Sequence, residues 1–324
     1  MSEKILKEEK YSKIKKILRN YNTSASDSSL KIYSGNIASF IREMGGDLEN
    51  PDANSFKDPT KIVELLNDKN LSINTKKNKV SAIVSFLSAL GASKKLIKEY
   101  SKKIEEYTLL IDKENLAMEW NDKEKNNLES IAELTEYMNL MKSKLPEDPK
   151  TFKELHRYMM YLSGAFHLKY PLRNELSDTK IFYDKEFNPK DMDEDTNYLV
   201  LSGGSAKMYL NKYKTKKTYG IIEFDIEDPE LVKMFSKYYD AIVKFIPTDY
   251  FDNWLLFKLD YGKMSRNSFT QLLQRTFSAT GKKISSSMIR KLVVSELYPV
   301  DKLKKLSNIM GHSVKTAITD YVRD

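Results

Sequence analysis

Apolar residues recur at helical spacing through the first part of the chain, and residues that start or stop helices separate the runs. Ser26 or Asp27 can cap the first helix, whose apolar positions extend to Met44, and Gly45-Gly46 can end it. Three further helices are predicted to start at capping residues: at Asp58-Pro59, at Asn74 or Thr75, and at Ser93. Residues 24–110 are therefore predicted to form a small helical bundle.

From about Leu128 the pattern changes, because short strand-like runs lie among the helical ones. Helices are predicted at residues 129–142, 151–168, 229–245, 265–279, 285–297, 300–309 and 314–322. Three strands are predicted at residues 198–201, 206–213 and 219–226, joined by Ser202-Gly203-Gly204 and by Thr215-Lys216-Lys217. We therefore expect a mainly α fold with a small antiparallel β-sheet embedded in helices.

Polar and acidic residues dominate the segment from Ile111 to Asn127, which predicts an interdomain linker. The chain has 324 residues, enough for two domains with cores of their own. We therefore expect a helical domain over residues 1–110, the linker over 111–127 and a second domain over 128–324. The alternative is that the segment is a surface helix of one larger domain.

The chain contains no cysteine and only three histidines, His156, His167 and His312. The lack of cysteine excludes thiol catalysis, disulfides and thiolate metal sites, and it fits an intracellular protein. With so few imidazoles, a multi-histidine metal centre is not expected. The sequence also has no apolar run of about 18 residues that would predict a membrane-spanning helix. Its charged N-terminus lacks the apolar core of a signal peptide.

The last predicted helix follows a tight turn at Gly311-His312 and carries Tyr321 nine residues after the histidine. Ser313 can cap this helix, so Tyr321 would lie about two turns into it. A phenol can attack phosphorus only where neighbouring groups stabilise its anion and the phosphoryl oxygens, as imidazole and guanidinium groups do. The alternative is a capped terminal helix without a chemical role.

Three further basic elements are candidates for the same site, although each has a simpler structural explanation when taken alone. Arg173 follows an apolar helix and could instead pair with Glu175 on the surface. The predicted hairpin tip 212–217 carries four lysines and no acid, so it could enter a DNA groove or remain a solvated turn. Ser285-Ser286-Ser287 could cap a helix that places Arg290 in its first turn, where an anion binds favourably.

In this order the elements resemble the active site of the tyrosine recombinase (phage integrase) family. That family combines a helical core-binding domain, which residues 24–110 resemble, with a catalytic domain that holds an Arg, a hairpin Lys, a His-x-x-Arg box, a Gly-His box and a nucleophilic Tyr. Carried over residue by residue, the resemblance implies these catalytic residues: Arg173, Lys214, Arg290, His312 and Tyr321. Lys214 is preferred because of its spacing from the next strand, and Lys216 is the alternative.

The chain departs from the family pattern in three places. Ser287 stands where the family has the His of His-x-x-Arg, and it could still hydrogen-bond a phosphate oxygen. Glu175 follows Arg173 by two residues, whereas the family's acid usually follows by three, about 100° further around a helix. Only three residues follow Tyr321, whereas many relatives have a longer tail that docks on a neighbouring subunit.

The resemblance implies that Tyr321 attacks a DNA phosphate to give a 3′-phosphotyrosine and a free 5′-hydroxyl, without a metal, ATP or another cofactor. Arg173, Arg290 and His312 would stabilise charge on the non-bridging oxygens and favour the phenolate. Lys214 would protonate the departing 5′-oxygen. Reversal with a different 5′-hydroxyl would complete site-specific recombination or integration.

The charge of the chain agrees with double-stranded DNA as the partner. The net charge is +8 and the isoelectric point is near 9.1, although a genome that favours lysine would have the same effect. Phosphate contacts are expected from five lysines: Lys76, Lys77, Lys79, Lys212 and Lys217. The family also implies a homo-tetramer on synapsed DNA, and the Lys- and Asn-rich composition favours a virus or mobile element as the source.

Two alternative functions remain open at the level of sequence. A type IB topoisomerase uses nearly the same residues to nick and reseal one duplex, but the helical N-terminal bundle favours a recombinase. A non-catalytic DNA-binding relative is the second alternative, and Ser287 in place of the family histidine favours it. The presence of Tyr321, His312 and both arginines argues against a loss of activity.

Overall fold

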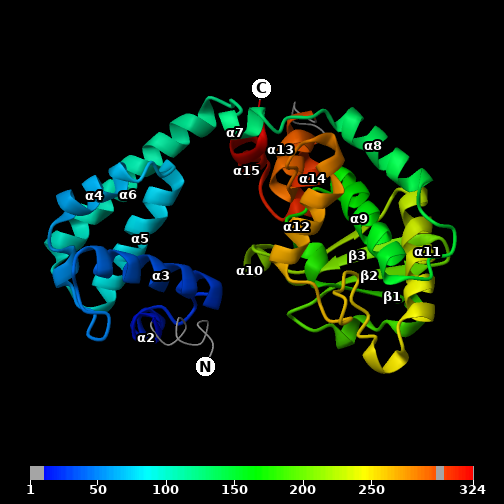
Figure 1. The fold of residues 1–324 in the computed structure, drawn as a ribbon, viewed down its shortest axis with the longest axis horizontal. Helices are drawn as coiled ribbons and strands as arrows, with labels where there is room; N and C mark the ends of the chain where they lie inside the picture. The colour runs from blue at the N-terminus through cyan, green and yellow to red at the C-terminus, as the bar shows by residue number, and fades with distance from the viewer. Residues whose placement is uncertain (1–10, 297–302, 324) are drawn as a thin grey trace. The chain divides into compact units, whose positions relative to one another are not determined.

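A computed structural model describes residues 11–296 and 303–323. The chain divides into two compact units, with the boundary between Ala117 and Met118 (Figure 1). Residues 111–127, predicted as a linker, include the end of a helix that continues to Leu116 and the short helix α7 (Asp122–Lys125). Trp120, from the same segment, is buried in the core of the second unit.

The first unit is helical throughout its described part. Its elements are α2 (Ser12–Tyr21), α3 (Asp27–Glu43), a 3₁₀ turn (Asn54–Phe56), α4 (Pro59–Asp68), α5 (Ile73–Ala89) and α6 (Lys94–Leu116). Ser26, Asp58 and Ser93 cap their helices as predicted, each accepting a backbone N–H from the first turn. Two details differ from the prediction: Ser72 caps α5, in place of Asn74 or Thr75, and α2 was not predicted.

Aromatic side chains from four elements form the centre of this first core. Phe56 lies edge-on to Phe40 of α3 and to Phe86 of α5, with ring centroids 6.3 and 5.8 Å apart. Tyr100 of α6 is fully buried and donates its hydroxyl hydrogen to the Phe56 carbonyl oxygen at 2.9 Å. This bond satisfies the one polar atom that the buried ring brings into the core.

The second unit combines helices with one small sheet, so the predicted mainly α fold is confirmed. Its main helices are α8 (Ile131–Ser143), α9 (Phe152–Lys169), α11 (Pro229–Phe245), α12 (Arg266–Thr276), α13 (Ser286–Glu296), α14 (Leu303–Met310) and α15 (Val314–Tyr321). Part of the helix predicted at residues 300–309 lies outside the described residues. No helix formed by residues 11–296 or 303–323 has both the length and the apolar character needed to span a membrane.

The sheet is mixed, which corrects the expected purely antiparallel arrangement. Its strands are β1 (Thr179–Tyr183), β2 (Asn197–Ser202), β3 (Ser205–Leu210) and β4 (Ile222–Asp225), in that order. β1 pairs with β2 in parallel, with Ile181 opposite Leu199, whereas β2–β3 and β3–β4 are antiparallel. β1 was not predicted, because the connection from β1 to β2 consists of loops and 3₁₀ turns and not the usual helix.

The lysine-rich connection between β3 and β4 is also different from the predicted hairpin tip. β3 ends at Leu210 and not at residue 213, because the backbone N–H groups of Asn211 and Lys212 donate to Asn197 Oδ1 at 2.9 and 2.6 Å. A loop and the one-turn helix α10 (Lys216–Tyr219) follow before β4 begins. Lys214 therefore lies in a loop that side-chain bonds hold in place.

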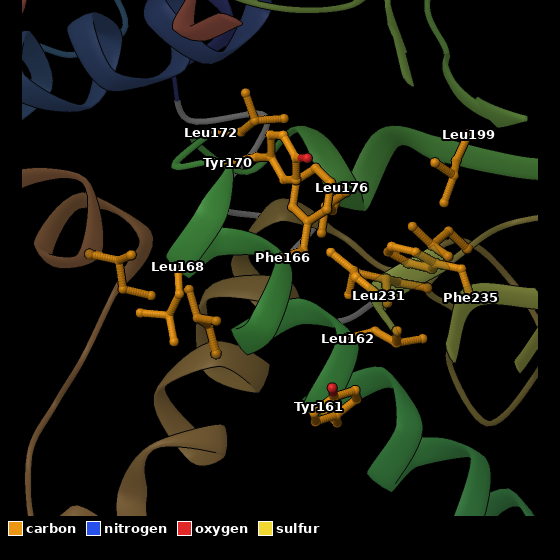
Figure 2. Close-up of a cluster of buried hydrophobic side chains, with 14 of the residues drawn as sticks. Tyr161, Leu162, Phe166, Leu168, Tyr170, Leu172, Leu176, Leu199, Leu231 and Phe235 are labelled. Carbon is orange, nitrogen blue, oxygen red and sulfur yellow. The ribbon is translucent and has the colours of Figure 1, made fainter. Parts of the chain in front are cut away.

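Helix α9 is the central helix of the second unit, and it leads directly to Arg173. Its buried side chains include Leu162 and Phe166, which pack with Leu231 and Phe235 of α11 (Figure 2). Beyond the end of α9, the buried side chains of Tyr170, Leu172 and Leu176 join the same cluster (Figure 2). The segment that carries Arg173 is thus anchored on both sides by apolar burial.

Candidate active site

Tyr321 lies where four of the five predicted catalytic side chains meet. The Arg173 Nη2 group donates a hydrogen bond to the Tyr321 hydroxyl at 3.3 Å. The Arg290 guanidinium carbon lies 5.2 Å from the centroid of the Tyr321 ring, and the His312 ring centroid is 5.3 Å away at a tilt of 30°. The phenol, which is only 8% exposed, is therefore surrounded by two cations and an imidazole.

A tight turn after α9 positions Arg173. The Leu172 N–H donates to the Tyr170 carbonyl oxygen at 2.7 Å, which bends the chain at Pro171. The neighbouring Leu172 and Leu176 side chains are buried, whereas Arg173 is only partly buried. The turn thus leaves the Arg173 side chain outside the apolar cluster, where it reaches Tyr321.

Arg290 is bound to the same turn from the other side. Its Nε–H donates to the Pro171 carbonyl oxygen at 2.9 Å, while its Nη2 group has no hydrogen-bond partner among the described residues. Burial lowers the pKa of Arg290, and Arg173 adds to this effect, whereas Tyr321 and Glu175 oppose it. Arg290 is in the second turn of α13 and not in the first, because this helix begins at Ser286.

The Gly-His pair ends α14 and places the imidazole. Gly311 has φ +66°, its N–H donates to the Asn308 carbonyl oxygen and the His312 N–H donates to the Ser307 carbonyl oxygen, both at 3.1 Å. This is the Schellman arrangement, in which a left-handed glycine closes the helix end. Ser313 then caps α15 by accepting the Thr316 N–H at 3.1 Å, as predicted.

The His312 ring is buried and electrically neutral at neutral pH. Burial lowers its pKa to about 4, and the positive charges of Arg173 and Arg290 contribute, whereas the Ser313 backbone opposes the shift. Within the described residues, neither ring nitrogen makes a hydrogen bond of normal geometry, to Ser313 or to any other group. One nitrogen can therefore donate a hydrogen bond, and the other can accept one.

Several buried polar atoms at this site lack a partner within the described part of the chain: Arg290 Nη2, His312 Nδ1, His312 Nε2 and Glu175 Oε2. A buried donor without a partner costs about 1–3 kcal/mol, so folded proteins rarely leave such donors together. The unpaired N–H groups around Tyr321 match the oxygens of a phosphate group. The same site can thus bind an anion at the position that the phenol can reach.

Glu175 adds a buried carboxyl to the surroundings of the two arginines. Burial raises its pKa, while the positive charges of Arg290, Arg173 and Arg266 act in the opposite direction. Its location in the 3₁₀ turn Glu175–Asp178, directly after the Arg173 turn, fits a supporting role toward the guanidinium groups.

Comparison with known proteins finds only a weak similarity. No protein-family profile matches the sequence, and no curated protein matches it. Among solved structures, the crystal structure of XerA recombinase is similar, with a TM-score of 0.40 and 16% identity over 98% of this chain and 95% of that one. A similarity at this level does not assign an activity to this chain.

Lys214 is close to the site through its neighbours in the loop. The Thr215 hydroxyl donates to the Gly311 carbonyl oxygen at 2.5 Å, and the Tyr213 ring packs against Gly311 so closely that a Cβ there would lie 2.6 Å from Cε2. The loop therefore lies against the Gly-His turn. Lys214 itself is exposed and makes no ion pair or hydrogen bond among the described residues. Lys216 is half-buried in α10.

Sequence reasoning missed Asn197, which joins the Lys214 loop to the Arg173 segment. Besides accepting the two loop N–H groups, Asn197 donates through Nδ2 to the Glu175 carbonyl oxygen at 3.1 Å and to the Lys212 carbonyl oxygen at 3.2 Å. The residue is fully buried, and its amide uses both its donor and its acceptor capacity. The one available signal in the sequence was a polar residue directly before the predicted strand 198–201.

Sequence reasoning also missed Ser295, which holds the end of the tyrosine helix. Its hydroxyl donates to the Tyr321 carbonyl oxygen at 3.3 Å and accepts the Arg323 N–H at 2.7 Å. Val322, between them, is buried. Ser295 belongs to α13, the same helix as Arg290, so contacts within the second unit fix the position of Tyr321.

The serine at the His-x-x-Arg position is not the serine of α13 that bonds to the Arg173 segment. Ser287 is exposed, whereas the neighbouring Ser286 donates its hydroxyl hydrogen to Asn174 Oδ1 at 2.9 Å. Asn174 in turn donates to Thr270 Oγ1 of α12 at 3.1 Å. Ser286 is therefore the serine that connects α13 to the Arg173 segment.

The predicted DNA-contacting lysines differ in their availability. On α5, Lys76 donates to Asn67 Oδ1 at 2.9 Å, and Lys79 donates to Asn36 Oδ1 at 3.3 Å with a pKa lowered by burial. Lys77 is half-exposed on the same helix. In the second unit, Lys212 pairs with Asp178 at 3.4 Å, whereas Lys217 is exposed on α10.

No group of three or more metal-binding side chains occurs among residues 11–296 and 303–323.

Proposed function

We propose that this chain cleaves and rejoins strands of double-stranded DNA through a covalent phosphotyrosine at Tyr321. The observation that carries the proposal is the set of buried Arg290 and His312 nitrogens that have no hydrogen-bond partner among the described residues, next to a phenol that already accepts a bond from Arg173. This arrangement supports a site for a phosphate group next to an oxygen nucleophile.

In the cleavage step the phenolic oxygen of Tyr321 forms a bond to phosphorus, and the bond from phosphorus to the 5′-oxygen of the next nucleotide breaks. The phenolic proton passes to water, and the departing 5′-oxygen takes a proton from Lys214. The products are a 3′-phosphotyrosine and a 5′-hydroxyl. Attack by a 5′-hydroxyl reverses the step, so the energy of the broken ester bond is conserved and no ATP is consumed.

The arginines and the histidine act on the oxygens of the phosphoryl group. Arg173 and the free Nη2 of Arg290 donate to the non-bridging oxygens, where negative charge increases in the transition state. His312, neutral because burial lowers its pKa to about 4, donates one N–H to the same oxygens. Because Arg290 and His312 are buried, and a bond to the Pro171 carbonyl oxygen and the Gly311 turn hold them in place, little reorganisation is needed when the charge develops.

Lys214 is the proton donor that the loop geometry supports best. Its ammonium group has no acidic partner among the described residues, and the adjacent Thr215 anchors the loop beside His312. Lys216 is the alternative donor. Site-specific recombination or integration by a homo-tetramer on synapsed DNA is the biological outcome that we propose, with a location inside the cell.

The test is capture of the covalent complex on a nicked suicide substrate, from which the 5′-terminal fragment diffuses away after cleavage. Wild-type protein should form a protein–DNA adduct stable to denaturation, and Tyr321→Phe, which lacks only the attacking oxygen, should form none. Arg173→Lys and Arg290→Lys should each lower the rate of adduct formation by about 10²–10³-fold. Absence of an adduct with the wild type would contradict the proposal and favour a non-catalytic DNA-binding protein, whereas an equal yield with Tyr321→Phe would show that Tyr321 is not the attacking group.

The two enzymatic outcomes separate in a second assay that contains a supercoiled plasmid and two linear duplexes. Exchange of strands between duplexes supports recombination. Relaxation of the plasmid without exchange supports the nicking and resealing reaction of a type IB topoisomerase.

A further inference from the structure

His167 is a buried imidazole in α9 that the chemistry above does not use. Its ring is fully buried and packs against Phe269 of α12, with ring centroids 5.4 Å apart. Its two nitrogens face two backbone carbonyl oxygens, with Nδ1 2.8 Å from the Ser163 oxygen and Nε2 3.0 Å from the Arg173 oxygen. The ring thus bridges α9 and the residue that bonds to Tyr321.

A neutral imidazole has a single N–H, so it can donate to only one of these two carbonyl oxygens. Burial lowers the pKa of His167 to about 4, and Arg290 contributes to the shift, so the ring is neutral at neutral pH although both carbonyl groups favour the charged form. The location of the single proton decides which carbonyl oxygen is bound.

The surroundings of the two carbonyl groups favour a proton on Nε2. Ser163 is inside α9, where its oxygen already accepts the backbone N–H four residues later, at His167. The Arg173 oxygen follows the end of the helix, and no other donor reaches it among the described residues. At Arg173 the imidazole N–H therefore supplies a hydrogen bond that the carbonyl oxygen otherwise lacks among the described residues, whereas at Ser163 it would only add a second bond.

We propose that His167 is a positioning residue, which fixes Arg173 by donating its Nε2–H to the Arg173 carbonyl oxygen. This inference rests on the proposed function, because the consequence concerns the reach of the Arg173 guanidinium group toward Tyr321 and the phosphate.

The hydrogen bond from His167 to Arg173 also affects the position of Arg173 relative to Arg290. Arg290 is bound to the Pro171 carbonyl oxygen, two residues before Arg173, and His167 holds the other end of the same short segment. The separation between the two guanidinium groups therefore depends on a turn that is fixed at both ends. A displacement of about 1 Å at a catalytic group can lower a rate about 10²-fold.

Two substitutions of His167 separate its two contacts. The glutamine amide nitrogen lies as many bonds from Cα as Nε2 does, so His167→Gln can keep the donor at the Arg173 oxygen. The asparagine amide nitrogen lies as many bonds from Cα as Nδ1 does, so His167→Asn can reach only the Ser163 side. Both variants replace the ring by an amide and lose its packing against Phe269, which makes each a control for the other.

We expect His167→Asn to lower the single-turnover rate of adduct formation by about 10–100-fold, with affinity for the same DNA changed less than about threefold. His167→Gln should recover most of the lost rate. Thermal unfolding of both variants measures the loss of packing. A glutamine variant as slow as the asparagine variant, at similar stability, would overturn the proposal.

The dependence on Arg173 is tested in a double-mutant cycle with Arg173→Lys. If His167 acts through Arg173, then His167→Asn should lower the adduct rate by less than about threefold in the Arg173→Lys background. An equally large effect in both backgrounds would show that His167 acts on another part of the site.

Nuclear magnetic resonance of the Arg173 side chain tests the positioning role without any catalytic step. It therefore separates failure of this inference from failure of the proposed function. The Arg173 Nε–H resonance, assigned by its loss in Arg173→Lys, should shift or broaden in His167→Asn and remain close to its wild-type position in His167→Gln. If the wild type forms no adduct but this pattern holds, then the positioning role remains and the proposed reaction fails. An unchanged resonance in His167→Asn would overturn the positioning role.

Discussion

The buried histidines determine how the second unit responds to acid. His167 has a pKa of about 4 in the folded protein, because burial disfavours the imidazolium, against 6.5 for an ordinary histidine. Between these two values the unfolded chain binds a proton that the folded chain does not, so lowering the pH favours unfolding. His312 acts in the same direction. Glu175, whose pKa is raised by burial, acts in the opposite direction and loses its contribution as the pH rises.

The difference between wild type and His167→Gln isolates the contribution of this histidine. We expect the wild type to lose about 2 kcal/mol more of its free energy of unfolding than His167→Gln when the pH falls from about 7 to about 5. Urea unfolding at both pH values, followed by a probe in the second unit such as the fluorescence of its tryptophans, measures the difference. Equal pH dependence of the two proteins would contradict a buried neutral His167.

At the scale of elements, the turn between α14 and α15 joins the imidazole, the tyrosine helix and the Lys214 loop. Gly311 is essential to it for two separable reasons. Its φ of +66° is unfavourable for residues with a side chain, and a Cβ would lie 2.6 Å from Tyr213 Cε2. Any larger residue therefore has to move the Tyr213 ring, and with it the loop that Thr215 binds to the turn.

We expect Gly311→Ala to destabilise the second unit more than Gly281→Ala does. Gly281 has a similar φ of +76° but no atom within 4 Å of an added Cβ, so it measures the backbone cost alone, about 1–2 kcal/mol. The overpacking against Tyr213 should add about 1–3 kcal/mol in Gly311→Ala, together with slower adduct formation. Equal free energies of unfolding for the two variants would show that the Tyr213 ring moves aside without cost.

The sequence predicted the helices better than the sheet, because the start of a helix depends on nearby residues whereas strand pairing depends on distant ones. Ser26, Asp58, Ser93 and Ser313 cap the helices that their positions predicted, because a cap depends on residues within one turn. β1 was missed because its parallel partner begins only after an irregular crossover. The early end of β3 depends on Asn197, a contact that no local pattern contains.

In the candidate site, too, local motifs were predictable from sequence and long-range contacts were not. The order of the motifs predicted five catalytic residues: Arg173, Lys214, Arg290, His312 and Tyr321. In the structure, Arg173, Arg290 and His312 lie around Tyr321. The residues that hold them, His167, Asn197 and Ser295, act through backbone carbonyl or N–H groups of distant segments. Such contacts depend on the tertiary fold and not on the type of residue contacted, so sequence spacing does not indicate them.

For the whole molecule, the net charge of +8 predicts DNA binding that weakens steeply with salt. Lys77→Gln on α5 and Lys217→Gln on α10 should each weaken binding uniformly across DNA sequences and lower the slope of log K against log salt by about 1. Lys103→Gln is the matched control, since Lys103 already pairs with Glu106 at 2.7 Å on α6. Fluorescence anisotropy across a salt series measures the slopes. Slopes unchanged from wild type would remove Lys77 and Lys217 from the contact surface.

Helix α13 carries both Arg290 and Ser295, which bonds to the end of the tyrosine helix. A displacement of this helix would therefore carry the Arg290 guanidinium group and Tyr321 in the same direction. Arg173 belongs to a different segment, but two hydrogen bonds join that segment to α13, from Arg290 to the Pro171 carbonyl oxygen and from Ser286 to Asn174. A displacement of α13 therefore also acts on the Arg173 segment, so that Arg173, Arg290 and Tyr321 change position together and not one at a time.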